Sequence, residues 1–302
     1  MIARTGTKIR WITLVLISGI ALCIHSCISF RMSPKEVDAF FHEKKVSATQ
    51  HSYRSGFREL HYVKAGDPKK PLILFLHGSP GSLSAFIGFL ADSALLTRGL
   101  LITTDRPGFG YSNFGNGEPS LQKQGEILRP ILEKYKTNRP IILVGHSLAG
   151  ALIVRMAAEY PDLVDGLIIV AGSVDPELEP NEFWFRAPLA TPFLSWMLPN
   201  SFRASNQEIY QLKPELEKMV PLWKNVSCPV IVIQGKKDEL VPPANADFAR
   251  KMLINAPVEF ILEEDMNHFV PWSHPHLIHD AILKMIETTS VPTAGSAQAG
   301  KD

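Results

Sequence analysis

Short, nearly continuous apolar runs recur along the chain from residue 71 onward, with little alternation of apolar and polar positions inside them. Such runs are typical of strands in a parallel sheet covered on both faces, because neither face meets water. Segments of helical length separate the runs, which favours βαβ units. The sequence therefore predicts an α/β protein with a doubly wound, mostly parallel sheet. The predicted strands cover residues 71–76, 100–102, 140–144, 167–170 and 229–233, with a weaker run at 258–262, and the predicted helices cover 121–135, 148–160, 244–253 and 276–287.

Two segments depart from this pattern. Residues 51–65 alternate apolar and polar positions, which predicts one or two antiparallel strands. Residues 175–227 separate two predicted core strands by an unusually long, aromatic-rich interval, so we expect an inserted helical cap. Within it Phe193, Trp196 and Met197 recur at helical spacing. This stripe favours packing of the cap on the core, with direct contact to substrate as the alternative.

The N-terminal residues have a distinct charge pattern. Arg4, Lys8 and Arg10 precede an uncharged stretch from Trp11 to Phe30. A basic region followed by an apolar run is typical of a secretory signal or a membrane anchor. A helix of about twenty residues spans about 30 Å, the thickness of the hydrocarbon core of a bilayer. Because positive charge stays inside, the body of the protein is expected outside the cytoplasm, anchored to the membrane.

Residues 24–27, Ile-His-Ser-Cys, resemble the cleavage box of bacterial lipoproteins, in which the cysteine is lipidated and becomes the new N-terminus. His25 departs from that box, since a small or aliphatic residue is usual at this position. The sequence leaves open a lipoprotein and a single-pass anchor, and a buried N-terminal helix is a third alternative.

Composition narrows the class of protein. The 302-residue chain is 45% hydrophobic, which is ordinary for a globular protein, and its net charge is +1. No basic stripe is present, so no nucleic acid partner is expected. The three cysteines, Cys23, Cys27 and Cys228, are too few for a disulfide framework. Cys228 opens an apolar run, where a small buried hydrophobe is expected rather than a nucleophile.

The predicted organisation follows from these segments. A polar stretch follows the anchor, and the small and polar residues at the C-terminus are typical of disorder. The predicted parts are a signal or membrane anchor over 1–30, a tether over 31–50, a core over 51–174 and 228–289, a helical cap over 175–227 and a disordered tail over 290–302.

The segment from Ile141 to Gly150 joins an apolar strand, a serine among small residues and a helix. A sharp strand–turn–helix corner strains the backbone of Ser147 and exposes its hydroxyl at the carboxyl edge of the sheet. Gly145 and Ala149 are small because strand and helix approach closely beside the serine. Ala149 replaces the second glycine of the usual Gly-x-Ser-x-Gly pattern, and one added methyl leaves the turn feasible. This context predicts that Ser147 is a nucleophile.

A serine hydroxyl is a poor nucleophile without an adjacent base. His268 follows the weak strand at 258–262, and Asp238 comes just after the strand before it. We expect His268 to be the base and Asp238 to be the acid that orients it. Asp175, which follows the preceding core strand, is the alternative acid.

From residue 51 to 289 these motifs resemble the α/β-hydrolase family. The order Ser, Asp, His along the chain is that of this family and differs from other serine triads. The resemblance implies that His268 takes the serine proton and returns it to the leaving group, while Asp238 fixes the histidine tautomer. The matching segments are His77–Gly81, Asp105–Ser112, Gly145–Gly150, Gly235–Asp238 and Asn267–His268.

An oxyanion hole is expected from two backbone N–H groups, since developing negative charge needs preorganised donors. The residue after the nucleophile, Leu148, offers one at a helix N-terminus. The second comes from the loop after the first core strand. Pro80 has no N–H, so Ser79 is the expected donor, and it matches the family's position.

The resemblance implies a serine hydrolase that cleaves an ester or related acyl bond. The aromatic cap favours a small to medium apolar acyl substrate. Serine at the elbow argues against haloalkane dehalogenase and epoxide hydrolase chemistry, because those relatives use aspartate there. Peptidase, lactonase, C–C hydrolase and perhydrolase activities are alternatives within the fold, as is a non-catalytic binding protein. No cofactor or metal is predicted, because His274, His276 and His279 lack companion acids.

Overall fold

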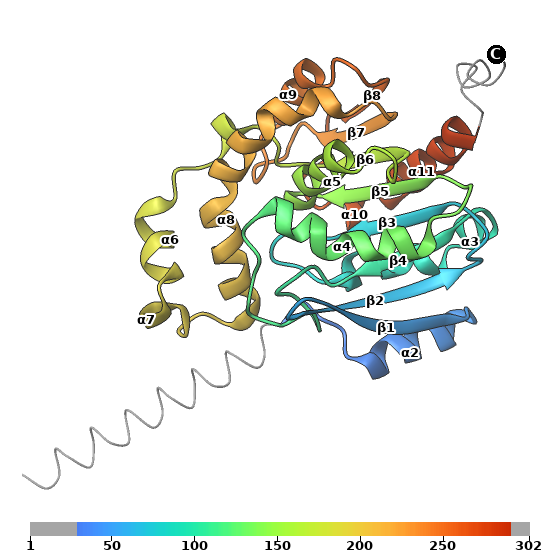
Figure 1. Cartoon of the computed structure of the whole chain (residues 1–302), viewed down its shortest axis with the longest axis horizontal. Helices are drawn as coiled ribbons and strands as arrows, with labels where there is room; N and C mark the ends of the chain where they lie inside the picture. The colour runs from blue at the N-terminus through green and yellow to red at the C-terminus, as the bar shows by residue number, and fades with distance from the viewer. Residues whose placement is uncertain (1–28, 291–302) are drawn as a thin grey trace, which may run out of the picture.

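A computed structural model describes residues 29–290. Eight strands form one sheet in the order β1-β2-β4-β3-β5-β6-β7-β8 (Figure 1). β2 pairs antiparallel with β1 and β4, and the other neighbouring pairs are parallel. The doubly wound, mostly parallel sheet predicted from the apolar runs is confirmed. The strands are β1 (Ala48–Ser55), β2 (Arg58–Gly66), β3 (Leu72–Leu76), β4 (Leu100–Thr104), β5 (Ile141–His146), β6 (Gly166–Val170), β7 (Val230–Gly235) and β8 (Val258–Glu263).

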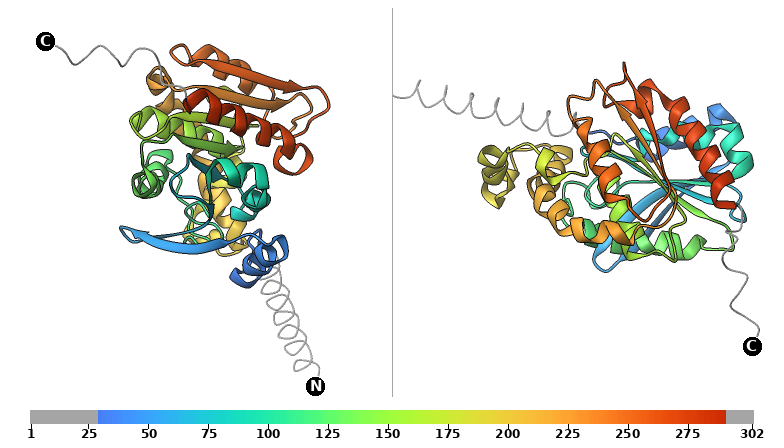
Figure 2. Two further views of the ribbon diagram at one scale, coloured as in Figure 1. Left: turned by 90° about the vertical axis from the view of Figure 1, so that its right-hand side faces the viewer. Right: turned by 90° about the horizontal axis from the view of Figure 1, so that it is seen from above.

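Both faces of the sheet are covered, which explains the apolar runs. Along β3, Leu72, Leu74 and Leu76 enter one hydrophobic cluster, whereas Ile73 and Phe75 enter another on the opposite face. Residues of α4, α5, α8 and α9 contribute to the first cluster, and residues of α2, α3 and α11 contribute to the second. Helices therefore lie on both faces of the sheet (Figure 2). The α-helices are α2 (Pro34–Lys44), α3 (Ser93–Arg98), α4 (Leu121–Tyr135), α5 (Leu148–Glu159), α6 (Phe183–Ala190), α7 (Pro192–Ser195), α8 (Asn200–Met219), α9 (Ala244–Met252), α10 (Val270–Ser273) and α11 (Pro275–Ser290), and the 3-10 helices are η1 (Leu83–Ala85), η2 (Ile87–Ala91), η3 (Pro176–Leu178) and η4 (Val220–Asn225).

The polar tether predicted over residues 31–50 is wrong, because most of this range is folded onto the core. Helix α2 starts with a capping box in which Ser33 and Glu36 exchange side-chain and backbone hydrogen bonds. Val37 and Phe41 on its inner side are buried in the second cluster. The first strand, β1, begins at Ala48, before the end of the predicted tether.

The interval between β6 and β7 is helical. The long helix α8 buries one face, including Leu212 and Leu216, against the core. Helices α6 and α7 bury no residue and project beyond the sheet (Figure 1). Packing of the aromatic stripe on the core is therefore a wrong expectation, since Phe193 is 81% exposed and Trp196 is 61% exposed. The helical spacing correctly indicated that these aromatic residues share a face, but this face is exposed and does not pack on the core.

The predicted anchor over residues 1–30 lies outside the described residues, except for its last two positions. The predicted tail over 290–302 lies outside them except for Ser290, the last residue of α11. Within the range from residue 29 to 290, none of the helices is both long and apolar enough to span a bilayer.

Candidate active site

The loop between β5 and α5 places Ser147 at a strained corner. Its backbone has φ 58° and ψ −126°, a conformation that costs a non-glycine residue free energy and is typical of functional sites. A Cβ on Gly145 would lie 2.3 Å from the carbonyl oxygen of Ala149. The close approach of strand and helix therefore requires glycine at 145, whereas Ala149 is accommodated as a buried residue. This is the elbow that the sequence predicts.

The loops after β7 and β8 bring Asp238 and His268 together. His268 Nδ1 lies 2.8 Å from Asp238 Oδ2. The other carboxylate oxygen accepts hydrogen bonds from the backbone N–H groups of Leu240, at 3.0 Å, and Val241, at 2.8 Å. Gln234 Nε2 lies 3.2 Å from Oδ2. Because each neighbour can donate, Asp238 acts as an acceptor towards the Nδ1–H of His268, which leaves Nε2 as the ring nitrogen available for proton transfer.

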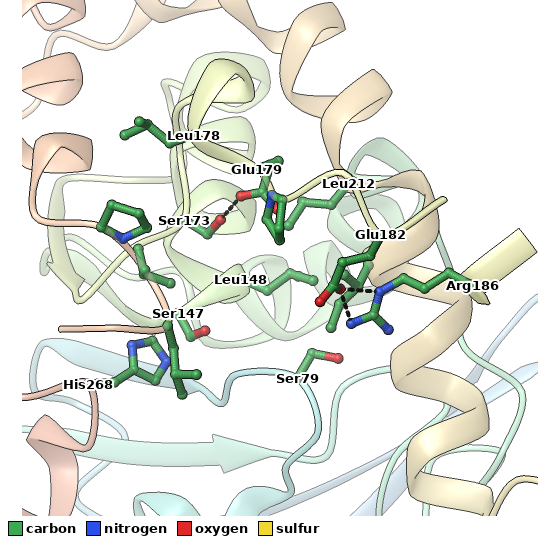
Figure 3. A pocket seen from close by; sticks show the side chains of 15 residues that line it. Ser79, Ser147, Leu148, Ser173, Leu178, Glu179, Glu182, Arg186, Leu212 and His268 are labelled. Carbon is green, nitrogen blue, oxygen red and sulfur yellow. Dashed lines mark hydrogen bonds and ion pairs between the residues drawn. The ribbon is translucent and has the colours of Figure 1, made fainter. Parts of the chain in front are cut away.

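Ser147 and His268 line the same cavity, as Figure 3 shows. Within residues 29–290 no hydrogen bond joins the serine hydroxyl to the imidazole. Hydrogen bonds of this kind are often loose without substrate and tighten in the complex. The arrangement thus brings the predicted nucleophile and the predicted base to one wall of the site.

His146 contacts His268, and it was not among the site residues predicted from the sequence. Its Nε2 lies 2.9 Å from the backbone carbonyl oxygen of His268, and the two ring centroids are 4.8 Å apart. Burial, followed by the charge of His268, lowers the pKa of His146 to about 3. His146 is therefore neutral and donates from Nε2, which connects the end of β5 to the loop that carries His268. The position of His146 between Gly145 and Ser147, directly before the predicted nucleophile, was the sequence signal that could have identified it.

The loop after β3 places Ser79 at the cavity that Ser147 also lines. The preceding carbonyl, of Gly78, accepts hydrogen bonds from His77 Nδ1 at 2.7 Å and from Arg106 Nη2 at 3.0 Å. In a trans peptide the carbonyl and the following N–H point in opposite directions, so these contacts fix the direction of the Ser79 N–H. The Leu148 N–H opens helix α5 and has no acceptor within that helix. Ser79, Leu148 and Ser147 line one cavity.

Arg106 connects this loop to the cap. Its Nε donates to the carbonyl of His77 at 2.7 Å, and its two terminal nitrogens lie 2.8 and 3.0 Å from the carboxylate oxygens of Glu208 on α8. Both side chains are buried. Burial, followed by the positive charge of Arg106, lowers the pKa of His77 well below its ordinary value. Neutral His77 donates from Nδ1 to Gly78 and accepts the backbone N–H of Arg106 at Nε2, 3.0 Å away.

Two cavities meet at Ser147 and differ in size and polarity. The first, of about 210 Å³, lies under the cap, and polar side chains including Glu179, Glu182 and Arg186 form part of its wall (Figure 3). The second, of about 610 Å³, extends to Phe30 and Trp272. The site therefore offers a compact, partly charged side and a larger, apolar side.

The charged side includes Glu179, whose carboxyl is incompletely paired. Glu182 pairs with Arg186 on α6, while the hydroxyl of Ser173 donates to Oε1 of Glu179. Oε2 of Glu179 makes no hydrogen bond to any residue between 29 and 290. Burial raises the pKa of Glu179, although the hydrogen bond from Ser173 opposes this effect. A substrate group that donates a hydrogen bond would complete the coordination of this carboxyl.

The model of the "Alpha/beta hydrolase family" matches residues 73–281 of the chain. The chain belongs to the α/β-hydrolase family. As an α/β-hydrolase it is similar to the 2-hydroxy-6-oxononadienedioate/2-hydroxy-6-oxononatrienedioate hydrolase of Paraburkholderia phymatum, with 24% identity over 82% of this chain and 99% of that protein. It is also similar to the mitochondrial palmitoyl-protein thioesterase ABHD10 of Rattus norvegicus, with 26% identity over 74% of this chain and 78% of that protein.

Solved structures show the same α/β-hydrolase fold. A membrane phospholipase A described as a bacterial virulence factor has a TM-score of 0.63 at 15% identity and covers 93% of this chain and 99% of its own. E-2-(acetamidomethylene)succinate hydrolase has a TM-score of 0.59 at 22% identity and covers 80% of this chain and 100% of its own. These identities show the fold, and the family membership makes the protein a hydrolase.

Asp175, the alternative to Asp238 as the acid, caps a helix in this α/β-hydrolase. Asp175 caps the 3-10 helix η3, where its Oδ1 accepts the backbone N–H of Glu177 at 2.9 Å. Its own N–H donates to the side chain of Asn245.

Among the described residues, no cluster of three or more His, Cys, Asp or Glu side chains has a geometry suited to a metal ion.

Proposed function

We propose that this α/β-hydrolase cleaves an ester or a related acyl bond through an acyl-enzyme on Ser147. The observation that carries the proposal is the contact between Asp238 and Nδ1 of His268, because it leaves the other ring nitrogen on the cavity wall that Ser147 shares. In this role His268 removes the proton of the serine hydroxyl as the hydroxyl attacks the acyl carbon, and later returns it to the leaving group. Asp238 stabilises the imidazolium that forms in between.

The backbone N–H groups of Ser79 and Leu148 are proposed to stabilise the oxyanion. Both residues border the cavity at Ser147, and Leu148 adds the positive end of the α5 dipole. Water then attacks the acyl-enzyme with His268 as base, which releases the acid and restores the hydroxyl.

The two cavities support a substrate with unequal halves. The larger cavity includes Phe30, Phe269 and Trp272 in its wall, and such surfaces take up apolar chains. The smaller one suits a compact polar group beside Glu179. We therefore propose an ester between an apolar acyl chain and a compact alcohol.

We also propose that residues 1–30 hold the enzyme at the extracytoplasmic face of a membrane. The support is the basic region before the uncharged stretch from Trp11 to Phe30. The lipoprotein and the single-pass anchor both satisfy this proposal.

Active-site labelling tests the proposed chemistry. A fluorophosphonate probe should label the wild type at Ser147 and should not label Ser147→Ala. Hydrolysis of p-nitrophenyl acetate by Ser147→Ala or His268→Ala should fall by roughly 10⁴-fold or more. Glu239→Ala, a change in the exposed residue next to Asp238, serves as the control and should keep wild-type activity. Equal labelling of wild type and Ser147→Ala would reject the assignment.

A further inference from the structure

The outer surface of the cap carries large apolar side chains that face water. Trp184 is 79% exposed and Phe193 is 81% exposed, and α6 and α7 bury no residue at all. Several large apolar side chains exposed on two neighbouring helices are typical of a site of interaction. The five residues that we call the cap patch are Phe183, Trp184, Phe193, Trp196 and Met197.

The cap patch lies near the point where the described chain begins. The ring of Phe30 meets the ring of Phe202 edge-on, with the centroids 6.0 Å apart. Phe202 belongs to the first turn of α8, and Met197 of the cap patch precedes this helix by only a few residues. The backbone carbonyl of Phe30 also accepts hydrogen bonds from Ser82 and Ser84, which fixes it to the body of the enzyme.

The sequence before Phe30 indicates what would cover the cap patch. The stretch from Trp11 to Phe30 is uncharged and long enough to enter a bilayer. With that stretch in the lipid, Phe30 would stand at the boundary between lipid and water. Aromatic side chains such as Trp184 and Trp196 are favoured at that boundary, because an amphipathic ring can contact both phases.

We infer that the cap patch rests on the surface of the lipid bilayer that the N-terminal segment enters. The inference rests on the proposed membrane anchor, and its activity readout rests on the proposed ester hydrolysis. The inference also indicates the path by which substrate would enter the apolar cavity. Phe30 lines that cavity together with Trp272 and Ser147, so an apolar ester would pass from the lipid into the cavity along Phe30 to reach the nucleophile.

Quenching by brominated lipid tests the contact without relying on activity. Full-length protein is incorporated into phosphatidylcholine vesicles with or without brominated acyl chains. Tryptophan fluorescence of the wild type should be quenched more than that of the double variant Trp184→Phe/Trp196→Phe, because the variant lacks the two tryptophans of the cap patch. Because Trp11 in the anchor is quenched in both proteins, equal or weaker quenching of the wild type would overturn the inference. That result is expected if residues 11–28 or a second copy of the chain covers the cap patch instead.

A pair of substrates tests the consequence for activity. Phe193→Ser/Trp196→Ser should lower hydrolysis of a long-chain ester carried in the vesicles by about tenfold, and should leave hydrolysis of soluble p-nitrophenyl acetate unchanged. Phe57→Ser is the matched control, since Phe57 is 89% exposed in the turn between β1 and β2, and it should change neither rate. An equal rate of the double variant on the vesicle ester would contradict the inference. Absence of all hydrolysis by the wild type would reject the proposed function alone, because the quenching still reports docking.

Discussion

Replacing Glu208 with alanine should lower both the stability and the rate of the enzyme, because Glu208 is the buried counterion of Arg106. The two side chains form a bidentate pair with N–O distances of 2.8 and 3.0 Å. The pair joins cap helix α8 to the loop that carries the Ser79 N–H.

The loss of stability follows from the burial of the pair. The side chain of Arg106 is 0% exposed and that of Glu208 is 1% exposed, so removal of the carboxylate leaves a buried charge without compensation. Such a change costs about 3–5 kcal/mol, a large fraction of the about 5–15 kcal/mol typical of a folded domain. Glu208→Gln retains an acceptor for Arg106 and should cost less, about 1.5–3 kcal/mol.

The loss of rate follows from the contact of Arg106 with Gly78. Without Glu208 the guanidinium loses two hydrogen bonds, while those to the His77 and Gly78 carbonyls and to Gln124 remain. The contact of Arg106 that helps to orient the Gly78–Ser79 peptide is therefore weakened. Complete loss of one oxyanion donor costs about 10²–10³-fold in rate. His77 still holds the Gly78 carbonyl, so we expect a smaller fall in kcat, about ten- to a hundredfold, with KM nearly unchanged. The change falls on kcat because the oxyanion contact is made in the transition state.

Glu215 provides the matched control for this experiment. It lies on the same helix and is also buried, but its carboxylate accepts the backbone N–H of Leu121 at 2.9 Å and does not touch the oxyanion loop. Urea unfolding and p-nitrophenyl acetate hydrolysis are measured at a temperature where all variants are folded. Glu215→Ala should lose stability and keep its kcat. If kcat per folded enzyme is the same in Glu208→Ala and Glu215→Ala, the pair supports the scaffold only and the reasoning is refuted.

Two further predictions concern side chains next to the site. The pKa of His146 is lowered to about 3 in the fold, whereas an unfolded histidine takes up a proton below about pH 6.5; stability should therefore fall as the pH drops from about 6.5 towards 3, by about 1.4 kcal/mol per pH unit for this residue. His146→Gln should reduce that slope in urea titrations by the same amount, and an unchanged slope would contradict the neutral assignment. The unpaired Oε2 of Glu179 should favour 3-hydroxypropyl decanoate over the equally sized butyl decanoate by about tenfold. Glu179→Leu should abolish this preference and Glu177→Gln, a change in an exposed neighbour, should retain it; equal wild-type rates on the two esters would refute the role.

The sheet and the three proposed catalytic residues could be predicted because each depends on local signals. The core strands are short apolar runs in the sequence. Each of the three residues, Ser147, Asp238 and His268, follows the carboxyl end of a strand. Parallel strands present these ends at one edge of the sheet, so the order of residues along the chain was enough to bring them together. The Ser-Pro-Lys-Glu stretch from Ser33 also carried a local signal, the capping box, but the polar composition around it masked helix α2.

Other features depend on contacts that no local pattern encodes. Arg106 and Glu208 are 102 residues apart in sequence, and nothing in the sequence near Glu208 indicates a buried acid. The aromatic stripe of the cap illustrates the same limit, because the spacing of Phe193 and Trp196 defines a helical face without defining what the face meets. The structure leaves that face in solvent.

The neutral state of the two buried histidines has a direct bearing on the proposed chemistry. His77 can hold the Gly78 carbonyl and accept the Arg106 N–H only with a proton on Nδ1 and none on Nε2. His146 stands against the ring of His268, with 4.8 Å between centroids. A charge on His146 would oppose the imidazolium that His268 forms in the proposed mechanism. Burial suppresses that charge and leaves Asp238 as the ionisable partner in contact with His268. In the proposed mechanism Asp238 therefore stabilises the imidazolium, and neutral His146 adds no opposing charge.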